Sequence, residues 1–278
     1  MKIAVTGSEG MLGYDIRQVF SDVELICLTY DSLDITKLDP VMKRIREVKP
    51  DFVINAAAFT DVDRCESEPD LAYLINGIGA RNVAMACEEA RCPVIHISTD
   101  YVFDGTKDGP YNEWDATSPI NQYGLSKLMG ERFITSLTSR FYVVRTSWLY
   151  GKNGKNFVDT IGRLLSERDS LDVVNDQVGS PTYTLDLARK LREIIGKGYG
   201  IYHVTNSGKC SWYEFAVAIA TKKGIDKRIT PVTSEMFRRP AKRPANSVLG
   251  HTMLRLEGLG EMRDWETALG EYLGVTGT

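Results

Sequence analysis

The stretch Lys2-Ile3-Ala4-Val5-Thr6-Gly7-Ser8-Glu9-Gly10-Met11-Leu12-Gly13 decides the fold. A short β-branched run leads into three glycines spaced three residues apart, and a helical stretch follows. Glycine allows a tight turn and lets the backbone approach a pyrophosphate with no Cβ in the way, while the next helix presents free N–H groups to the phosphates. The sequence therefore predicts a dinucleotide-binding turn formed by Gly7, Gly10, Met11, Leu12 and Gly13.

Strand-like and helix-like segments alternate along the first 150 residues. The expected strands are apolar runs, as in a parallel sheet buried on both faces: Lys2–Thr6, Val23–Thr29, Asp51–Asn55, Val94–Ser98 and Phe141–Arg145. The expected helices carry apolar residues at helical spacing: Met11–Phe20, Leu38–Glu47, Leu71–Ala90 and Gln122–Leu137. This alternation predicts an α/β fold with a Rossmann-type, doubly wound parallel sheet.

The pattern becomes irregular after residue 150. Asn153–Arg168 and Leu185–Ile195 look helical, Leu171–Val174 looks extended, and Gly200–Val204 has the composition of a further strand. We predict a dinucleotide-binding domain over 1–150, to which segments near 170–176 and 185–205 return. The remainder of 151–278 is expected to form a smaller, discontinuous C-terminal substrate-binding domain.

Composition and charge narrow the class of protein. The net charge of the 278 residues is −3, so no global positive field attracts nucleic acid or an anionic membrane. No apolar run reaches the roughly 20 residues that cross a bilayer, and the N-terminus lacks a signal-peptide pattern. Five cysteines without CxxC spacing and three scattered histidines predict reduced thiols, a cytoplasmic location and no metal site, with Cys27 as a core residue.

Tyr123 and Lys127 form a YxxxK pair at the start of an expected helix, where residues four apart share one face. Reduction of a ketone needs a proton donor at the carbonyl oxygen, and a nearby ammonium lowers the pKa of a tyrosine towards neutral pH. Thr99 lies 24 residues upstream, at the carboxyl end of an expected parallel strand, where open α/β sheets bind ligands. Together the three residues predict a site that reduces a carbonyl group.

Cofactor choice depends on the residues after the second strand. Asp31 lies 18 residues after Gly13, close to the spacing at which an acidic side chain bonds the ribose hydroxyls of NAD. No arginine follows that strand to hold a 2′-phosphate. NADPH and NADH both remain open.

These motifs resemble those of the dTDP-4-dehydrorhamnose reductase family of extended short-chain dehydrogenases/reductases. The matching segments cover nearly the whole chain, and besides the glycine turn they are Leu33–Thr36, Asn55–Thr60, Ser98–Gly105, Tyr123–Lys127, Arg145–Gly151, Asp176–Thr182, Arg243–Ser247 and Asp264–Glu266. The Ser-Thr-Asp-Tyr-Val-Phe-Asp-Gly and Arg-Thr-Ser-Trp segments are the more specific ones.

The resemblance implies an oxidoreductase that uses NADPH or NADH to reduce the C4 ketone of dTDP-4-dehydro-L-rhamnose, giving dTDP-L-rhamnose. It implies a catalytic triad of Thr99, Tyr123 and Lys127. Further cofactor contacts are expected from Asp34 and Ile35 at the adenine and from Ala56, Ala57 and Ala58. The nucleotide-sugar is expected to contact Thr99, Asp100, Tyr101, Trp148 and Arg243.

Two of these substrate contacts also follow from the residues themselves. Trp148 ends the fifth strand, where an aromatic ring can stack on a sugar or a base, although plain core packing would also explain it. The basic loop Arg238–Asn246 contains Arg238, Arg239, Lys242 and Arg243, which could neutralise a pyrophosphate, and we favour Arg243. A solvated loop is the alternative for these four side chains.

Other functions are compatible with the same fold. A dehydratase of this superfamily needs a glutamate in the Asp-Glu pair after the threonine, whereas Thr99 is followed by Asp100 and Tyr101. A reductase of another nucleotide-sugar stays open, as does a catalytically silent regulatory subunit that only binds a dinucleotide and a partner. Some relatives bind Mg²⁺ at an acidic dimer contact, but no matching cluster occurs in the sequence, which therefore does not support a homodimer.

Overall fold

A computed structural model of the chain describes residues 1–275. Its centre is a sheet of six strands in the order β10-β5-β4-β3-β1-β2, and every neighbouring pair is parallel. The strands are β1 (Lys2–Thr6), β2 (Glu24–Leu28), β3 (Phe52–Asn55), β4 (Val94–Thr99), β5 (Phe141–Thr146) and β10 (Gly200–His203). The predicted doubly wound parallel sheet is confirmed. Since β2 is an edge strand, Cys27 is exposed, and the expectation that it lies in the core is wrong.

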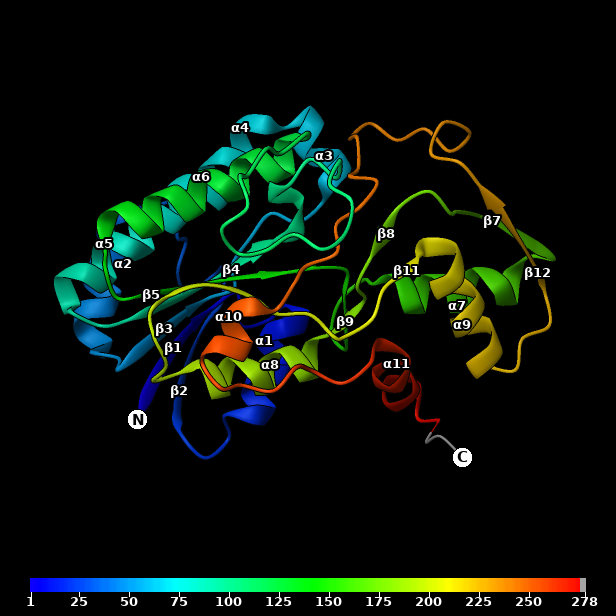
Figure 1. Cartoon of the computed structure of the whole chain (residues 1–278). Coiled ribbons are helices and arrows are strands. Elements are labelled where there is room, and N and C mark those ends of the chain that lie inside the picture. Colours follow the sequence, from blue (N-terminus) through cyan, green and yellow to red (C-terminus); the bar gives the residue numbers. More distant parts are fainter. Residues whose placement is uncertain (276–278) are drawn as a thin grey trace.

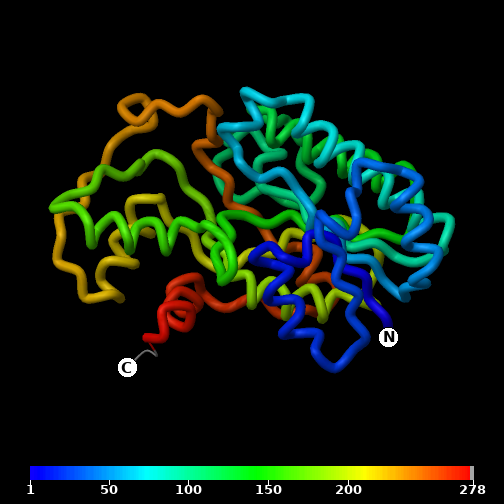
Figure 2. The backbone as a smooth tube through the Cα atoms, turned by 180° about the vertical axis from the view of Figure 1, so that it is seen from behind, coloured from blue at the N-terminus to red at the C-terminus, as the bar shows by residue number. Residues whose placement is uncertain are grey.

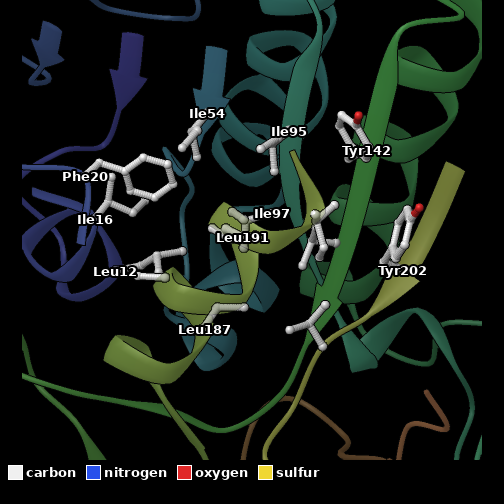
Figure 3. Packing of buried hydrophobic residues seen from close by; sticks show 14 of the residues in the cluster. Leu12, Ile16, Phe20, Ile54, Ile95, Ile97, Tyr142, Leu187, Leu191 and Tyr202 are labelled. Carbon is white, nitrogen blue, oxygen red and sulfur yellow. The ribbon is translucent and has the colours of Figure 1, made fainter. Parts of the chain in front are cut away.

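Helices cover both faces of the sheet (Figure 1). One face carries α2 (Leu38–Val48), α5 (Ala80–Ala90) and α6 (Gln122–Leu137), and the other carries α1 (Met11–Val19), α8 (Thr184–Ile194) and α10 (Thr252–Leu256). Ile16 of α1, Phe20 directly after it, and Leu187 and Leu191 of α8 pack under the strands in one apolar cluster (Figure 3). A segment late in the chain thus completes the core of the sheet.

The expected helix over 71–90 contains a change of helical type. α3 (Val62–Ser67) and α4 (Pro69–Ala72) lead into a π-helical segment, η1 (Tyr73–Gly79), which continues into α5. Asn76 in η1 accepts a hydrogen bond from the Phe59 amide at 2.8 Å and donates to the Ser126 hydroxyl at 2.9 Å. Wide helical turns of this kind are frequent at functional sites, and this one ties the loop after β3 to α6.

A smaller lobe lies beside the sheet domain (Figures 1 and 2). Its helices are α7 (Phe157–Glu167), α9 (Trp212–Lys222) and α11 (Trp265–Leu273). Its short strands pair two by two: β7 (Ser170–Val174) with β12 (Arg228–Val232), β8 (Val178–Gly179) with β11 (Cys210–Ser211), and β6 (Leu149–Tyr150) with β9 (Thr182–Tyr183).

One expectation about the second half is wrong. The segment near 170–176 does not return to the large sheet, because β7 pairs along its length with β12 and packs in the apolar cluster of the smaller lobe. The segment over 185–205 does lie with the large sheet, where α8 packs on α1 and β10 pairs with β5. The chain therefore crosses between the two lobes several times.

Candidate active site

A cavity of about 590 Å³ opens at the carboxyl edge of the parallel strands, where open α/β sheets bind their ligands. It runs from the glycine turn past β4 to the smaller lobe. Of the residues singled out from the sequence, those that line it are Gly7, Gly10, Met11, Leu12, Gly13, Ala56, Ala58, Thr99, Asp100, Tyr101, Tyr123, Lys127 and Trp148. Folding thus brings the glycine turn, the YxxxK pair and Thr99 into one cleft.

The glycine turn fits a dinucleotide. Gly7 has φ of +66°, and a Cβ there would lie 2.7 Å from the Ala57 nitrogen, so only glycine fits between the turn and β3. A Cβ on Gly13 would lie 2.6 Å from the backbone of Ser8. No side chain caps the start of α1 and no acidic residue lies in its first turn, which leaves N–H groups for an anionic ligand.

The other expected cofactor residues lie outside this cavity. Ala57 sits behind Gly7, with its amide 3.4 Å from the Thr6 hydroxyl. Asp31 is exposed in the turn after β2, whereas Asp34 accepts hydrogen bonds from the amide and hydroxyl of Thr36. Ile35 is buried in the core. The structure does not bring these four residues together with Tyr123 and Lys127.

β4 and α6 position the three residues of the expected triad. Thr99 ends β4, and Tyr123 and Lys127 occupy the first two turns of α6. The side chain of Asn121 caps this helix by accepting a hydrogen bond from the Gly124 amide at 2.8 Å. A Cβ on Gly124 would lie 2.1 Å from the Tyr101 carbonyl oxygen, so glycine lets α6 approach the chain that follows Thr99.

The electrostatics of this pair differ from the expectation. Burial raises the pKa of Tyr123 above its usual value, although the Thr99 hydroxyl opposes the rise. Burial lowers the pKa of Lys127 to about 8, and Glu131 opposes that fall. The Lys127 ammonium donates a hydrogen bond to the Ile97 carbonyl at 2.6 Å. The prediction of a lowered pKa for Tyr123 is therefore wrong, because burial of the phenol raises it.

Asp100 and Tyr101 follow Thr99 directly and form a short 3₁₀ turn, η2 (Asp100–Val102). The Thr99 hydroxyl donates to the Asp100 carboxylate at 2.9 Å, and burial raises the pKa of Asp100 to about 7. The second carboxylate oxygen of Asp100 is buried without a hydrogen-bond partner. Tyr101 packs edge-on against Tyr123, with ring centroids 5.8 Å apart. Both side chains therefore stand where a polar ligand in the cleft would meet them.

Trp148 lies in the cleft, stacked on a residue that the sequence analysis missed. Its ring is parallel to that of Trp212, the first residue of α9, with centroids 3.5 Å apart and planes 5° apart. The Trp148 backbone has φ of +48°, and a Cβ on Gly179 would meet its ring at 2.5 Å. Both indole rings line the cavity. The capping box of Ser211 and Glu214 predicts where α9 begins, but it does not reveal the stack.

A second cavity of about 650 Å³ continues from the first, with Tyr101 and Trp212 on the boundary. Arg243 and Arg239 from the basic loop line it, whereas Arg238 and Lys242 do not. Asp63 holds both arginines, at 2.7 Å from Arg243 and 3.2 Å from Arg239. Arg168 after α7 adds a third guanidinium that sequence reasoning missed. This cavity can receive an anionic group.

Many acidic side chains in the described chain form ion pairs with arginine or lysine. Among residues 1–275, no group of three or more histidine, cysteine, aspartate or glutamate side chains is arranged to hold a metal ion. Asp186 and Glu271, for example, both pair with Arg263. In the same part of the chain, no helix has the length and apolarity needed to cross a membrane.

Comparison with known proteins gives one family over nearly the whole chain. The family model described as "RmlD substrate binding domain" matches residues 1–276. The spore coat polysaccharide biosynthesis protein SpsK of Bacillus subtilis is 44% identical over 98% of this chain and 96% of its own. The dTDP-4-dehydrorhamnose reductase of Aggregatibacter actinomycetemcomitans is 39% identical over 96% and 97%. The dTDP-4-keto-6-deoxy-D-glucose reductase of Streptomyces niveus is 39% identical over 95% and 94%.

Solved structures agree with this result. The dTDP-4-dehydrorhamnose reductase of Clostridium acetobutylicum superposes with a TM-score of 0.97 and 47% identity, covering 99% of both chains. That of Bacillus anthracis, in complex with NADP, superposes with a TM-score of 0.96 and 42% identity over 99% of both chains.

Proposed function

The chain belongs to the family of the RmlD substrate binding domain, and from this premise we propose that it reduces the C4 ketone of dTDP-4-dehydro-L-rhamnose to dTDP-L-rhamnose with NADPH or NADH. The observation that carries the proposal is the convergence of Thr99, Tyr123 and Lys127 on the cleft that the glycine turn closes at its other end. Relatives named as dTDP-sugar reductases support an oxidoreductase of this class.

The nicotinamide cofactor, when bound, supplies the hydride to the carbonyl carbon. Gly7, Gly10 and Gly13 would hold its pyrophosphate with the first turn of α1. Lys127 points into the same cleft and would bond the nicotinamide ribose. The exposed Asp31 after β2 is our candidate for the adenine ribose, with Asp34, Ile35, Ala56, Ala57 and Ala58 as further contacts.

Tyr123 would donate the proton to the C4 oxygen. Thr99 accepts a hydrogen bond from the Tyr101 amide at 3.1 Å, which orients its hydroxyl near Tyr123 and next to Asp100. From there, Thr99 can bond the same substrate oxygen and align it with the phenol. Burial raises the pKa of Tyr123, so the proton stays on the phenol until hydride arrival places negative charge on the C4 oxygen, which then takes that proton.

The nucleotide would extend from the cleft into the second cavity. Arg243, with Arg239 beside it, provides charge for the pyrophosphate, and Asp63 holds both guanidinium groups in place. Asp100, Tyr101 and Trp148 would contact the sugar at the junction of the two cavities. A cytoplasmic location stays a prediction, which the five thiol side chains support.

The test is direct reduction of the sugar. Purified protein with NADPH and dTDP-4-dehydro-L-rhamnose should consume the nicotinamide absorbance and yield dTDP-L-rhamnose by mass spectrometry and NMR. Repeating the assay with NADH gives the cofactor preference. Tight NADPH binding without any loss of absorbance would refute the proposal and favour the regulatory-subunit alternative.

A second candidate is reduction of another dTDP-sugar ketone. The Streptomyces niveus relative, named for dTDP-4-keto-6-deoxy-D-glucose, has the same identity to this chain as the relative from Aggregatibacter actinomycetemcomitans. The two sugars should be offered at equal concentration. A higher kcat/KM for dTDP-4-dehydro-L-rhamnose supports the first assignment, and the reverse order supports the second.

A further inference from the structure

Three consecutive residues of β4 hold three residues of α6 that are spaced one helical turn apart. The Ile97 carbonyl accepts from Lys127 at 2.6 Å, and the Ser98 hydroxyl donates to Glu131 at 2.5 Å. Thr99, next in the strand, faces Tyr123. Since residues 123, 127 and 131 are four apart, they lie along one face of α6. We call the contacts of residues 97–99 with residues 123, 127 and 131 the β4–α6 seam.

Besides Ser98 of β4, Glu131 also binds Arg145 of β5. The Arg145 guanidinium donates to both carboxylate oxygens, at 2.9 and 2.7 Å, and the two side chains are only 3% and 4% exposed. Arg145 also donates to the Glu113 carbonyl at 3.2 Å and lies over the Phe103 ring. The pair thus fastens α6 to β5 and to the loop that follows β4.

Stability alone is a weak explanation for this pair. Replacing a buried ion pair by well-packed apolar residues is often neutral or stabilising, because burial of two charges costs most of what their attraction returns. A buried pair does specify one arrangement, since an uncompensated charge results if either partner moves away. Here the specified arrangement is the position of α6 along its own axis relative to the end of β4, which carries Thr99.

We propose that Glu131 is a positioning residue for the reduction: with Ser98 and Arg145 it fixes the register of α6 on β4, and it places a carboxylate one helical turn beyond Lys127. The kinetic part rests on the proposed function. The structural part rests on the β4–α6 seam alone.

The charge on Lys127 depends on few neighbours. Glu131, four residues on in α6, and His96 of β4 act on it directly. Arg145 of β5 is paired with Glu131, whereas Asp100 and, on α3, Cys65 act on Tyr123. Burial and Lys127 itself hold the pKa of His96 well below its usual value, so this ring is neutral. From η1, Asn76 is uncharged. Glu131, paired with Arg145, thus opposes the fall that burial causes in the pKa of Lys127.

The first test is Glu131→Gln, which keeps the shape and removes the charge. In this variant, kcat and the affinity for NADPH, each measured against pH, should begin to fall at a pH roughly one unit lower than in the natural protein. We call this fall on the alkaline side the alkaline limb. Glu131→Asp keeps the charge but shortens the side chain, so its limb should stay in place while kcat falls. Glu167→Gln, in the exposed pair with Arg163 on α7, is the matched control and should change neither kcat nor the alkaline limb.

Glu131→Gln leaves Arg145 unpaired and could unfold the protein, so Glu131→Gln combined with Arg145→Met is the second variant. We expect this double variant to regain much of the lost Tm while its alkaline limb stays displaced. If kcat and the alkaline limb returned to their natural values together with Tm, the inference would be overturned, because the Glu131–Arg145 pair would then be purely structural. An unshifted limb in both variants would also overturn it.

The NADPH titration keeps this inference separate from the proposed function. It requires no sugar and reports Lys127 through cofactor binding. If the natural protein reduces none of the sugars offered but the binding limb still moves in Glu131→Gln, the proposed function fails and the inference about Glu131 stands. If the sugar is reduced and neither limb moves, the inference fails alone.

Discussion

Asp100 is a carboxyl group buried beside Thr99, and its ionisation links the cleft to the stability of the fold. Burial raises its pKa from 3.8 to about 7. Between these values the folded state binds more protons than the unfolded state, so this group's contribution to stability is present at low pH and is lost as the pH rises to about 7.

Replacing Asp100 by Asn should therefore stabilise the protein more at pH 8 than at pH 4, since the amide carries no charge to bury. Tm measured for the natural protein and Asp100→Asn at both pH values gives the comparison, with Asp108→Asn, at an exposed carboxyl group, as the control. The same Tm difference at both pH values would show that Asp100 does not titrate as described.

Gly124 also acts at the scale of one residue, through the space it leaves. A Cβ would lie 2.1 Å from the Tyr101 carbonyl oxygen, so Gly124→Ala should push α6 away from the end of β4 and separate Tyr123 from Thr99. We expect a loss of about 1–3 kcal/mol in the free energy of unfolding, as for overpacking elsewhere, together with a larger fall in kcat. Chemical denaturation measures the first quantity. Gly260→Ala, where a Cβ meets nothing within 4 Å, should leave both unchanged.

At the scale of elements, α9 contributes to the cleft through its first residue. Trp212 stacks on Trp148 and also contacts Phe157 of α7, with ring centroids 4.5 Å apart. Trp212→Ala should release the Trp148 ring, so the near-UV circular dichroism of the stacked pair should disappear. The KM for the nucleotide-sugar should rise about three- to tenfold, the equivalent of one aromatic contact, with a smaller effect on kcat. Trp114→Phe, at a ring 63% exposed, is the control; an unchanged KM in Trp212→Ala would remove α9 from the substrate site.

At the scale of the whole molecule, the sheet domain is not contained in residues 1–150. Leu187, Leu191 and Ile194 of α8 are fully buried under the sheet, and β10 provides its sixth strand. A fragment of residues 1–150 would expose this apolar cluster, so it should lack cooperative thermal unfolding, whereas the full chain should unfold cooperatively. A fragment with a sharp transition by circular dichroism would show that α8 and β10 are dispensable.

The parts of the fold that the sequence predicted are those whose signal is local. Apolar runs marked the buried strands of the large sheet, and apolar residues at helical spacing over Gln122–Leu137 gave α6 with its observed bounds. The partner of β7 could not be read this way, since an extended segment does not reveal which strand it pairs with. The smaller lobe follows from pairings such as β7 with β12, which lie far apart in the chain.

The same distinction applies to the candidate site. Glycine spacing and the YxxxK pair are local signals, and the residues they mark, Gly7, Tyr123 and Lys127, do line one cleft. The sequence missed Trp212, Glu131 and Arg168 because each depends on a neighbour brought close only by folding, as Arg145 is to Glu131. It also predicted the wrong pKa direction for Tyr123, because the pattern does not show that the phenol is buried.

The most direct test of the proposed reduction is Tyr123→Phe, which keeps the ring and removes the proton donor. With NADPH and dTDP-4-dehydro-L-rhamnose, we expect the turnover of the variant to fall by about 100-fold or more while the affinity for NADPH stays as in the natural protein. Tyr199→Phe, at an exposed ring, serves as the control for loss of a phenol elsewhere. Turnover by Tyr123→Phe close to that of the natural protein would contradict the assignment of Tyr123 as the acid.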